Sequence, residues 1–506
     1  MARTHQLNVL SALDRAKKQR YHLAAAAVAC LGFLAGSYNL FSVVFVYRVI
    51  GRVYYADPAR PAEPGTLPLR ATAALTGAAF CGTFIGQLAF GWLGDRLGRR
   101  RAYGLSLSLM AVCSAASGLS FGRTAKAVVA TLCFFRFWLG VGAGGGYPLS
   151  AAIIAEYADK RRRGMFLAAV YAMQGVGILL GSAITIVAAA AVPEADYVWR
   201  AILMVGAVPA ALGFYLRSKL PETARYTALV AGDPKRAAAD MSRLLRASIQ
   251  AQEELNVSVG GVDGEWGLFS VHFLKSHGLH LLATASSWFL LDVTYYSQSL
   301  LQRDLLGKLG WVSSSPAAAM DAVQEVSRLA RAQALIALCG AVPGYCFAVV
   351  LIDVLGRRRL QLAGFLVMTL SMLALAALYD HWTSHVAGFA ALYNLAFFFA
   401  NLGPNTTTFV APAELFPARL RCTCHGIAAA AGRAGAVLGA FGFLPKKGAD
   451  GEYAAGIGTR NELFVLAGTN FLGMLMTLFV PETRGASLEV LSKEVVYEAA
   501  DMAAYS

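Results

Sequence analysis

Apolar stretches recur along nearly the whole chain and are separated by short polar and basic segments. Each stretch is about 20 residues long, the length at which an α-helix crosses roughly 30 Å of hydrocarbon. The pattern predicts an all-α membrane protein with twelve transmembrane helices. The predicted spans lie at about 22–46, 71–94, 103–121, 127–155, 164–190, 199–217, 278–300, 331–354, 360–379, 386–411, 424–443 and 462–481.

A long polar stretch separates the sixth span from the seventh and divides the chain into two similar parts. We predict an N-terminal six-helix bundle at 1–217, a cytoplasmic central loop at 218–277, a C-terminal six-helix bundle at 278–481 and a cytoplasmic tail at 482–506. The pattern of the central loop is typical of one or two short surface helices, and no residue in it suggests catalysis.

The composition supports membrane insertion. Hydrophobic residues make up 57% of the chain and charged residues only 15%, whereas soluble domains carry about 25% charged residues. The net charge of +14 is typical of some nucleic-acid-binding proteins, but here the lysines and arginines cluster in the loops on one side of the predicted spans. This positive-inside pattern predicts a lipid bilayer rather than nucleic acid as partner, with both termini cytoplasmic. The first apolar run is too long for a cleavable signal peptide.

Three motifs recur in the same order in the two halves of the chain, 258 to 260 residues apart. Repeats of this kind predict two related six-span halves with a substrate site between them near the membrane midplane. The matching pairs are 95–101 with 353–359, Glu156 with Glu414, and 221–223 with 481–483.

The repeated motifs place carboxylates and arginines at the cytoplasmic ends of corresponding spans. Carboxylates, helix ends and guanidinium groups can pair across neighbouring helices, so we expect a gate whose ion pairs break and reform. The alternative is that the arginines only fix the topology. The predicted gating residues are Asp95, Arg99, Glu156, Asp353, Arg357 and Glu414.

Two motifs invite other interpretations. Residues 140–145 fit G-x-G-x-x-G, but a dinucleotide site needs a preceding strand, and within an apolar span such glycines indicate close helix packing. Cys422 and Cys424 beside His425 lack the second pair of ligands that a metal site would need. The sequence therefore predicts no cofactor, no metal and no enzymatic activity.

Polar residues inside spans are the candidates for function, because they are costly in hydrocarbon. Trp288, Asp292 and Tyr296 are spaced four apart and share one helical face, which suits a cavity wall better than a lipid surface; an interfacial belt is the alternative for the two aromatic residues. A lone carboxylate in hydrocarbon is held protonated, so Asp292 is the candidate for proton coupling.

The later spans add a fixed positive charge and a helix break. Arg433 keeps its charge and needs an anionic partner. Gly403 and Pro404 can break a helix and turn backbone groups towards a cavity. The remaining polar candidates are Arg136, Tyr147, Gln174 and Asn405. One fixed cation, hydroxyl and amide donors and one titratable acid describe a site for an oxyanion that travels with a proton.

The chain resembles the phosphate:proton symporters of the major facilitator superfamily, and among them the plant high-affinity inorganic phosphate transporters. The segments that carry the resemblance are 91–95, 147–150, 288–298, 403–405 and 423–426. It implies a plasma-membrane protein that imports inorganic phosphate with protons. It also implies phosphate contacts from Tyr147, Gln174, Trp288, Asp292, Tyr296 and Asn405, with Arg433 where the family has lysine.

The sequence departs from the family pattern at three membrane carboxylates, whose places are taken by Gly36, Asn39 and Gly146. The residues expected to contact the oxyanion are thus retained, whereas the acids expected to carry protons are reduced mainly to Asp292. Weakly coupled or uncoupled transport, transport of a related oxyanion, and a non-transporting phosphate-binding receptor therefore stay open. A sugar or organic-cation transporter is a more remote alternative, and Arg433 argues against cations.

Overall fold

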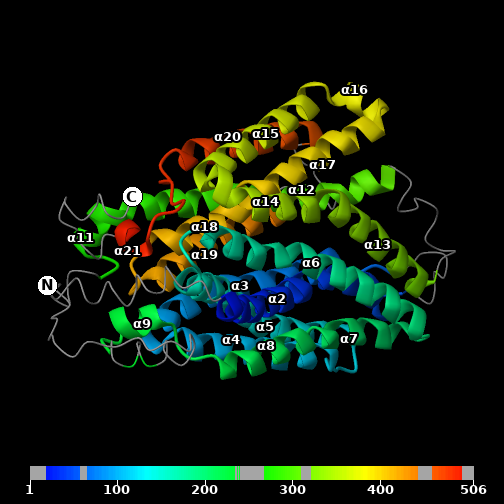
Figure 1. Cartoon of the computed structure of the whole chain (residues 1–506). Coiled ribbons are helices and arrows are strands. Elements are labelled where there is room, and N and C mark those ends of the chain that lie inside the picture. The colour runs from blue at the N-terminus through cyan, green and yellow to red at the C-terminus, as the bar shows by residue number, and fades with distance from the viewer. Residues whose placement is uncertain are drawn as a thin grey trace, which may run out of the picture.

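The computed structural model describes residues 19–56, 65–233, 236, 239, 267–308, 321–442 and 458–492. Within these ranges the secondary structure is helical, with no strand. The long helices run roughly side by side along one direction, and the helix that begins the described chain starts at the same end of the molecule at which the last long helix finishes (Figure 1). We call this the termini end, and the other the opposite end.

The first half contains six rods. A single residue, Gly206, interrupts the sixth; a Cβ at this position would collide with the amide of Asn39, so glycine allows α2 to approach closely. The helices are α2 (Gln19–Tyr54), α3 (Leu69–Leu97), α4 (Arg99–Gly118), α5 (Ala125–Tyr157), α6 (Arg163–Ala191), α7 (Ala195–Val205) and α8 (Ala207–Lys219).

The second half repeats this plan with more interruptions. The predicted break at Gly403 is confirmed, because α17 ends at Leu402 and α18 begins at Pro404. The helices are α12 (Leu279–Lys308), α13 (Ala322–Ile336), the π-helical turn η3 (Ala337–Ala341), α14 (Val342–Leu355), α15 (Arg357–Ala377), α16 (Tyr379–Ser384), α17 (Val386–Leu402), α18 (Pro404–Leu415), α19 (Arg421–Phe441) and α20 (Thr459–Thr477).

Each predicted span corresponds to one helix or to consecutive helical pieces, but several boundaries were wrong. The first helix continues to Tyr54 instead of 46, and α13 begins at Ala322 instead of 331. Hydropathy marks the part of a helix within hydrocarbon, and polar turns extend it beyond. The predicted central loop contains α9 (Ala224–Leu229), α11 (Val271–Phe273) and the π-helical turn η1 (Leu274–Gly278); most of it lies outside the described residues.

By length and composition, seven described helices can span a membrane. They are Leu23–Tyr54, Leu69–Leu97, Ala125–Tyr157, Arg163–Ala191, Ala195–Lys219, Ala322–Leu355 and Arg357–Ala377. The other rods are more polar, shorter or broken, and two of them, α12 and α19, carry Asp292 and Arg433. The hydropathy criterion therefore misses two helices that carry charged candidate site residues.

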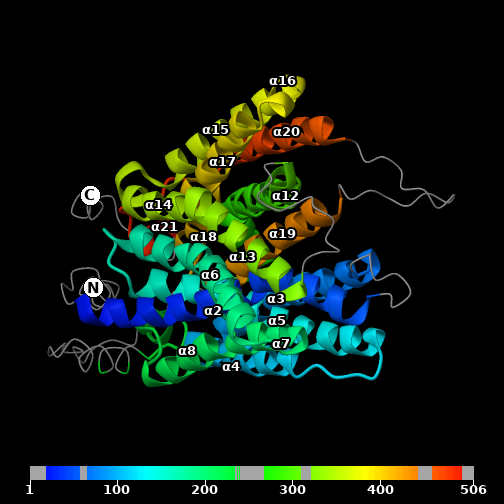
Figure 2. The ribbon, with the colours of Figure 1, turned by 90° about the vertical axis from the view of Figure 1, so that its right-hand side faces the viewer.

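Two six-helix bundles meet along α3 with α19 and along α6 with α13 and α14. Figure 2 shows the peripheral helices of the two halves on opposite sides of this interface, with α4 and α8 on one side and α15 and α20 on the other. Buried residues of both halves, including Tyr147, Tyr171 and Phe409, form one hydrophobic cluster. The core of the molecule therefore lies between the bundles as well as within them.

The glycines at 140–145 serve helix packing, as predicted. A Cβ at Gly140 or Gly144 would collide with backbone carbonyls of α3, and one at Gly142 would lie 3.0 Å from the Ser106 carbonyl of α4. These glycines let α5 pack tightly against both neighbours. That packing positions Tyr147 and Arg136 of the same helix.

Candidate anion site and gates

Arg433 lies at the centre of the candidate site. Its guanidinium donates hydrogen bonds from Nη1 to the Tyr296 hydroxyl at 2.6 Å and from Nη2 to the Tyr147 hydroxyl at 3.2 Å. Nε has no hydrogen-bond partner, and within the described part of the chain no carboxylate forms an ion pair with this arginine. The side chain is 3% exposed, so a buried cation is held only by neutral groups.

Aromatic rings enclose this cation. The guanidinium carbon lies 5.6 Å from the ring centres of Phe80 and Tyr147 and 5.5 Å from that of Tyr296. Trp288 packs behind Tyr147, with ring centres 6.4 Å apart. A Cβ at position 432 would collide with the Trp288 indole, so Gly432 lets α19 seat that ring.

Asp292 shares the face of α12 with Trp288 and Tyr296, as predicted. The residue is buried, and its carboxylate has no hydrogen bond or ion pair to another described residue. It interacts with Arg433 electrostatically at longer range than a salt bridge. The buried acid and the buried cation therefore interact without direct contact.

Asn405 belongs to a separate polar network at the helix break. Its amide nitrogen donates to the Tyr345 hydroxyl at 2.9 Å and to Asn401 Oδ1 at 2.8 Å, and its Oδ1 accepts from the Tyr171 hydroxyl at 2.8 Å. The structure thus joins Asn405 to aromatic residues that sequence reasoning missed. It does not place Asn405 in contact with Arg433.

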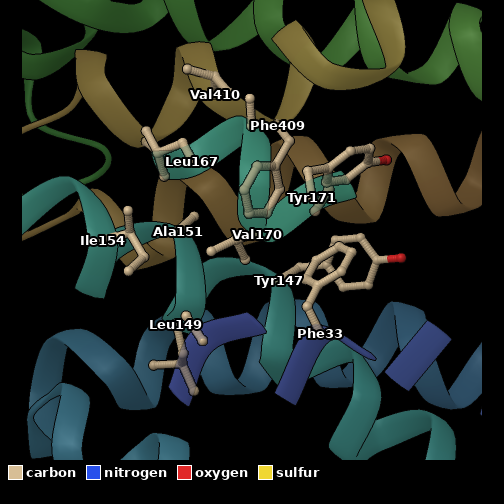
Figure 3. Packing of buried hydrophobic residues seen from close by; sticks show 14 of the residues in the cluster. Phe33, Tyr147, Leu149, Ala151, Ile154, Leu167, Val170, Tyr171, Phe409 and Val410 are labelled. Atoms are coloured by element: carbon tan, nitrogen blue, oxygen red, sulfur yellow. The ribbon is translucent and has the colours of Figure 1, made fainter. Parts of the chain in front are cut away.

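A stack of aromatic rings links the two networks. Phe33 packs against Tyr147 at 4.9 Å and against Tyr171 at 5.2 Å, and Tyr171 packs against Phe409 at 4.8 Å (Figure 3). Gln174, one helical turn beyond Tyr171, is buried with its Oε1 unpartnered. Aromatic residues are ordinary in apolar spans, so no sequence signal distinguished Phe33, Tyr171 or Phe409 from core residues.

The structure shows the surroundings of Asn39 and Gly146, two of the three positions at which the resembled family has a membrane carboxylate. Within the described residues, no atom lies within 4 Å of where a Cβ on Gly146 would stand, so this position faces open space beside Tyr147. The Asn39 amide instead donates to the carbonyls of Ala35 and Gly206 at 2.9 and 3.2 Å and accepts from Ser114. An ionised carboxylate at position 39 would face two carbonyl oxygens.

At the termini end, the predicted gating residues form two matching clusters. In the first half, Arg99 pairs with Glu156 at 2.9 Å and with Asp95 at 3.3 Å, and Thr223 donates to Glu156 at 2.5 Å. These residues come from α3, α4, α5 and the start of α9. All four are buried.

The second half repeats this cluster. Arg357 pairs with Glu414 and with Asp353, both at 2.8 Å, and Thr483 donates to Glu414 at 2.5 Å. The structure therefore brings all six predicted gating residues together, three in each half. The equivalent contacts follow the sequence repeat.

Each gating aspartate also caps a helix of the other half. Asp95 accepts from the backbone nitrogens of Cys422 and Thr423 at 3.2 and 2.7 Å, in the first turn of α19. Asp353 accepts from the backbone nitrogen of Met165 at 2.8 Å, in the first turn of α6. A negative charge at a helix N-terminus is stabilising, so these caps hold the halves together at the termini end.

Further contacts close the same end. Arg421 of the second half pairs with Glu156 of the first at 3.0 Å. Residues 483–492, which we call the strap, follow α20 and end with α21 (Leu488–Leu491). From the strap, Glu489 pairs with Arg225 at 2.9 Å. Burial alone would raise the pKa of Glu489, but Arg225 lowers that pKa to about 2.

At the opposite end, the halves are joined less extensively and enclose a cavity. Arg52 pairs with Glu325 at 2.5 Å. The cavity has a volume of about 280 Å³ and is lined by α2, α3, α12, α13 and α19 among others, with Phe80 and Tyr296 in its wall. The two halves are therefore joined by buried ion pairs at the termini end, and a cavity lies between the candidate site and the opposite end.

Comparisons with known proteins agree with this architecture. The profile of the family described as "Sugar (and other) transporter" matches residues 25–494. The chain is 58% identical to the probable inorganic phosphate transporter 1-3 of Oryza sativa subsp. japonica, over 97% of this chain and 98% of that one. It is 55% identical to the low affinity inorganic phosphate transporter 1 of Petunia hybrida, over 96% of both.

Among solved structures, the proton:xylose symporter XylE bound to 6-bromo-6-deoxy-D-glucose superposes with a TM-score of 0.71 at 21% identity. The match covers 96% of this chain and 99% of the XylE chain. That likeness shows the fold, and the relatives show that the chain is a transporter and not an enzyme. The chain belongs to the sugar (and other) transporter family of the major facilitator superfamily, on the branch of the plant inorganic phosphate transporters.

Proposed function

We propose that this chain imports inorganic phosphate together with protons across the plasma membrane by alternating access, with both termini in the cytoplasm. The observation that carries the proposal is Arg433, a buried cation without a carboxylate partner whose hydrogen bonds go to two tyrosine hydroxyls. Each hydroxyl keeps its own hydrogen free to donate to an anion. The relatives are inorganic phosphate transporters by name, which supports phosphate as the anion.

A phosphate beside Arg433 would meet a charge-assisted donor in a dry site, where such hydrogen bonds are strongest. Trp288 and Tyr296 would close around it from α12. Gln174 and Asn405 would complete the contacts after a rearrangement, because Asn405 is bonded to Tyr171 and Tyr345 in this conformation.

Asp292 is the proposed proton carrier. Protonated, it leaves the positive field of Arg433 uncompensated, and the anion is held. Ionised, it competes with the anion for the same cation and favours release. This opposition couples the two ligands through one site.

Alternating access is supported by the uneven closure of the two ends. Ion pairs and reciprocal helix caps join the halves at the termini end, whereas a cavity reaches from Tyr296 towards the opposite end. Breaking the caps while closing the cavity would expose the site to the other side. The gating residues Asp95, Arg99, Glu156, Asp353, Arg357 and Glu414 would carry that exchange.

Weakly coupled phosphate transport is the second candidate, and a specific observation favours it. The open space at Gly146 and the satisfied amide of Asn39 leave Asp292 as the acid beside Arg433. Fewer titratable groups provide fewer routes for protons.

Uptake of radiolabelled phosphate by proteoliposomes, with and without an inward proton gradient, separates the candidates. Symport predicts accumulation above equilibrium only with the gradient. Uncoupled transport predicts equilibration with or without it. A non-transporting receptor would bind phosphate but give no uptake above that of protein-free liposomes.

A further inference from the structure

Arg136 of α5 is a second buried cation with no acidic partner. Its side chain is fully buried, and Nη1 donates to the Asn39 carbonyl at 2.7 Å. Nε and Nη2 have no hydrogen-bond partner. Its titratable neighbours are Tyr47 and Cys133, and among the described residues no carboxylate pairs with it. Arginine cannot escape this position by losing its proton.

Arg136 lines the 280 Å³ cavity on the opposite end of the site. Apart from this guanidinium, the wall consists of aromatic and aliphatic residues with a few neutral polar groups, among them Thr72, Thr76 and Ser299. An unpaired buried charge is strongly destabilising. The described lining of the cavity thus includes a residue with such a charge and no acid, which suits an anion.

The same cavity leads to Arg433. Phe80 and Tyr296 form part of its wall, their rings pack edge to face at 5.5 Å, and both rings contact the Arg433 guanidinium on their other side. These two rings therefore separate the cavity from the central cation. Arg136 precedes Tyr147 by eleven positions on α5, which places the two residues about 16 Å apart along the helix.

We infer that Arg136 forms an outer anion site, at which a phosphate-class oxyanion binds before it passes between Phe80 and Tyr296 to Arg433. This inference rests on the proposed function, because it assigns the entry step of the same substrate. The two cations form a stepped path: the outer one attracts the anion from water, and the inner one receives it once the ring pair opens.

The bond to the Asn39 carbonyl gives Arg136 a structural role as well, since it ties α5 to α2. Lysine at this position would retain the charge, whereas glutamine would retain a donor for the carbonyl without the charge. An anion site requires the charge. A purely structural tie requires only the donor.

The test is equilibrium binding of radiolabelled inorganic phosphate to the purified full chain in nanodiscs, with the number of phosphates per chain as readout. We expect two binding classes in the natural chain and one in Arg136→Gln, while Arg136→Lys keeps both. Arg433→Gln should retain the outer class alone. In proteoliposomes, Arg136→Gln should raise the phosphate concentration for half-maximal uptake about tenfold with little change in maximal rate.

A second pair of variants leaves Arg136 in place. Thr76 lines the same cavity and forms a hydrogen bond with Tyr47, an electrostatic neighbour of Arg136, so Thr76→Asp supplies a competing carboxylate and Thr76→Asn is its neutral control. We expect Thr76→Asp to lose the outer class and Thr76→Asn to keep it. One phosphate per natural chain, unchanged in Arg136→Gln and Thr76→Asp, would overturn the inference and leave the proposed function standing. Absence of both binding and uptake in the natural chain would overturn both.

Discussion

The key residues of the candidate site are buried and lack an ion-pair partner among the described residues. Arg433, Arg136 and Asp292 are all buried, and none forms an ion pair among the described residues. Buried charges are normally paired or they destabilise the fold, so we propose that ligands compensate the charges at these three positions. Five of the six predicted gating residues are equally buried and Asp353 is partly buried, but all six are paired, which fits the structural and switching role proposed for them.

The proton role of Asp292 predicts that Asp292→Asn binds phosphate but loses accumulation driven by a pH gradient. Asparagine is similar in size and cannot titrate, so the anion can no longer be traded for a proton. Uptake into proteoliposomes at external pH 5 and 7 measures this. Ser286→Ala on the same helix, whose hydroxyl bonds its own backbone, is the control. Undiminished gradient-driven accumulation in Asp292→Asn would remove this residue from the mechanism.

The open space beside Gly146 predicts that Gly146→Asp folds and steepens the pH dependence of uptake. A carboxylate there would stand next to Tyr147 and close to the anion. Gly146→Asn fills the same space without a titratable group and should leave the pH profile flat. If transport is weakly coupled, uptake by the natural chain should depend on pH less steeply than uptake by Gly146→Asp. A steep acid-stimulated uptake in the natural chain, unchanged by Gly146→Asp, would contradict this.

The predicted gating contacts lie at helix termini rather than in helix interiors. Asp95 caps α19 and Asp353 caps α6, so each half stabilises the first turn of a helix in the other. The break between α17 and α18 likewise occurs where Asn405 meets Tyr171 of the first half. A small movement of either half changes these contacts together.

At this scale, Asp95→Asn should weaken the cap on α19 and open the termini end. Loss of a charged hydrogen-bond partner costs about 1.5–3 kcal/mol, which corresponds to roughly a tenfold or larger rise in the open population. The buried Cys422 beside this cap should then react faster with a water-soluble maleimide, measured by peptide mass spectrometry. Asp159→Asn, which removes a partly exposed charge between α5 and α6, is the control. Equal modification in natural chain and Asp95→Asn would show that the cap does not hold the gate.

Sequence patterns predicted the long helices, the break at Gly403 and the charged clusters of the six predicted gating residues, because hydropathy and the internal repeat are local or periodic signals. They did not predict that Asn405 would be held by Tyr345 and Tyr171, or that Arg136 would lie unpaired on a cavity. Those facts depend on how helices distant in sequence pack. Aromatic residues such as Phe33 carry no polar signal in an apolar span.

As a whole, the molecule has two halves that are held firmly at one end and separated by a cavity at the other. The strap adds to the firm end, since Glu489 reaches Arg225 and the Ala486 carbonyl accepts from Arg163 at 3.1 Å. These contacts lie after the last long helix and join it to the first half. The strap therefore favours the conformation observed.

Glu489→Gln should destabilise this closed conformation by about 3–5 kcal/mol, because it removes the carboxylate from the buried Arg225–Glu489 ion pair. Glu489 has a pKa of about 2 when folded, below its unfolded value, so its contribution is present above about pH 4.3 and is lost as pH falls towards 2. Maleimide modification of Cys422 should be faster in Glu489→Gln than in the natural chain, and the ratio of the two rates should be the same at pH 5 and at pH 6.5, because the thiolate fraction changes equally in both. Glu482→Gln tests whether any nearby charge has the same effect. Release of the strap from the first half of the natural chain between pH 5 and 6.5 would contradict the proposed role of the Glu489–Arg225 ion pair.

The central claim is that Arg433 holds transported phosphate, and initial uptake of radiolabelled phosphate into proteoliposomes tests it most directly. The account predicts saturable uptake by the natural chain, a modest loss in Arg433→Lys and a loss of at least about thirtyfold in Arg433→Gln. The larger loss corresponds to about 2–5 kcal/mol for removing a buried charge from its partner. Equal uptake by the natural chain and Arg433→Gln, with both folded, would contradict the claim.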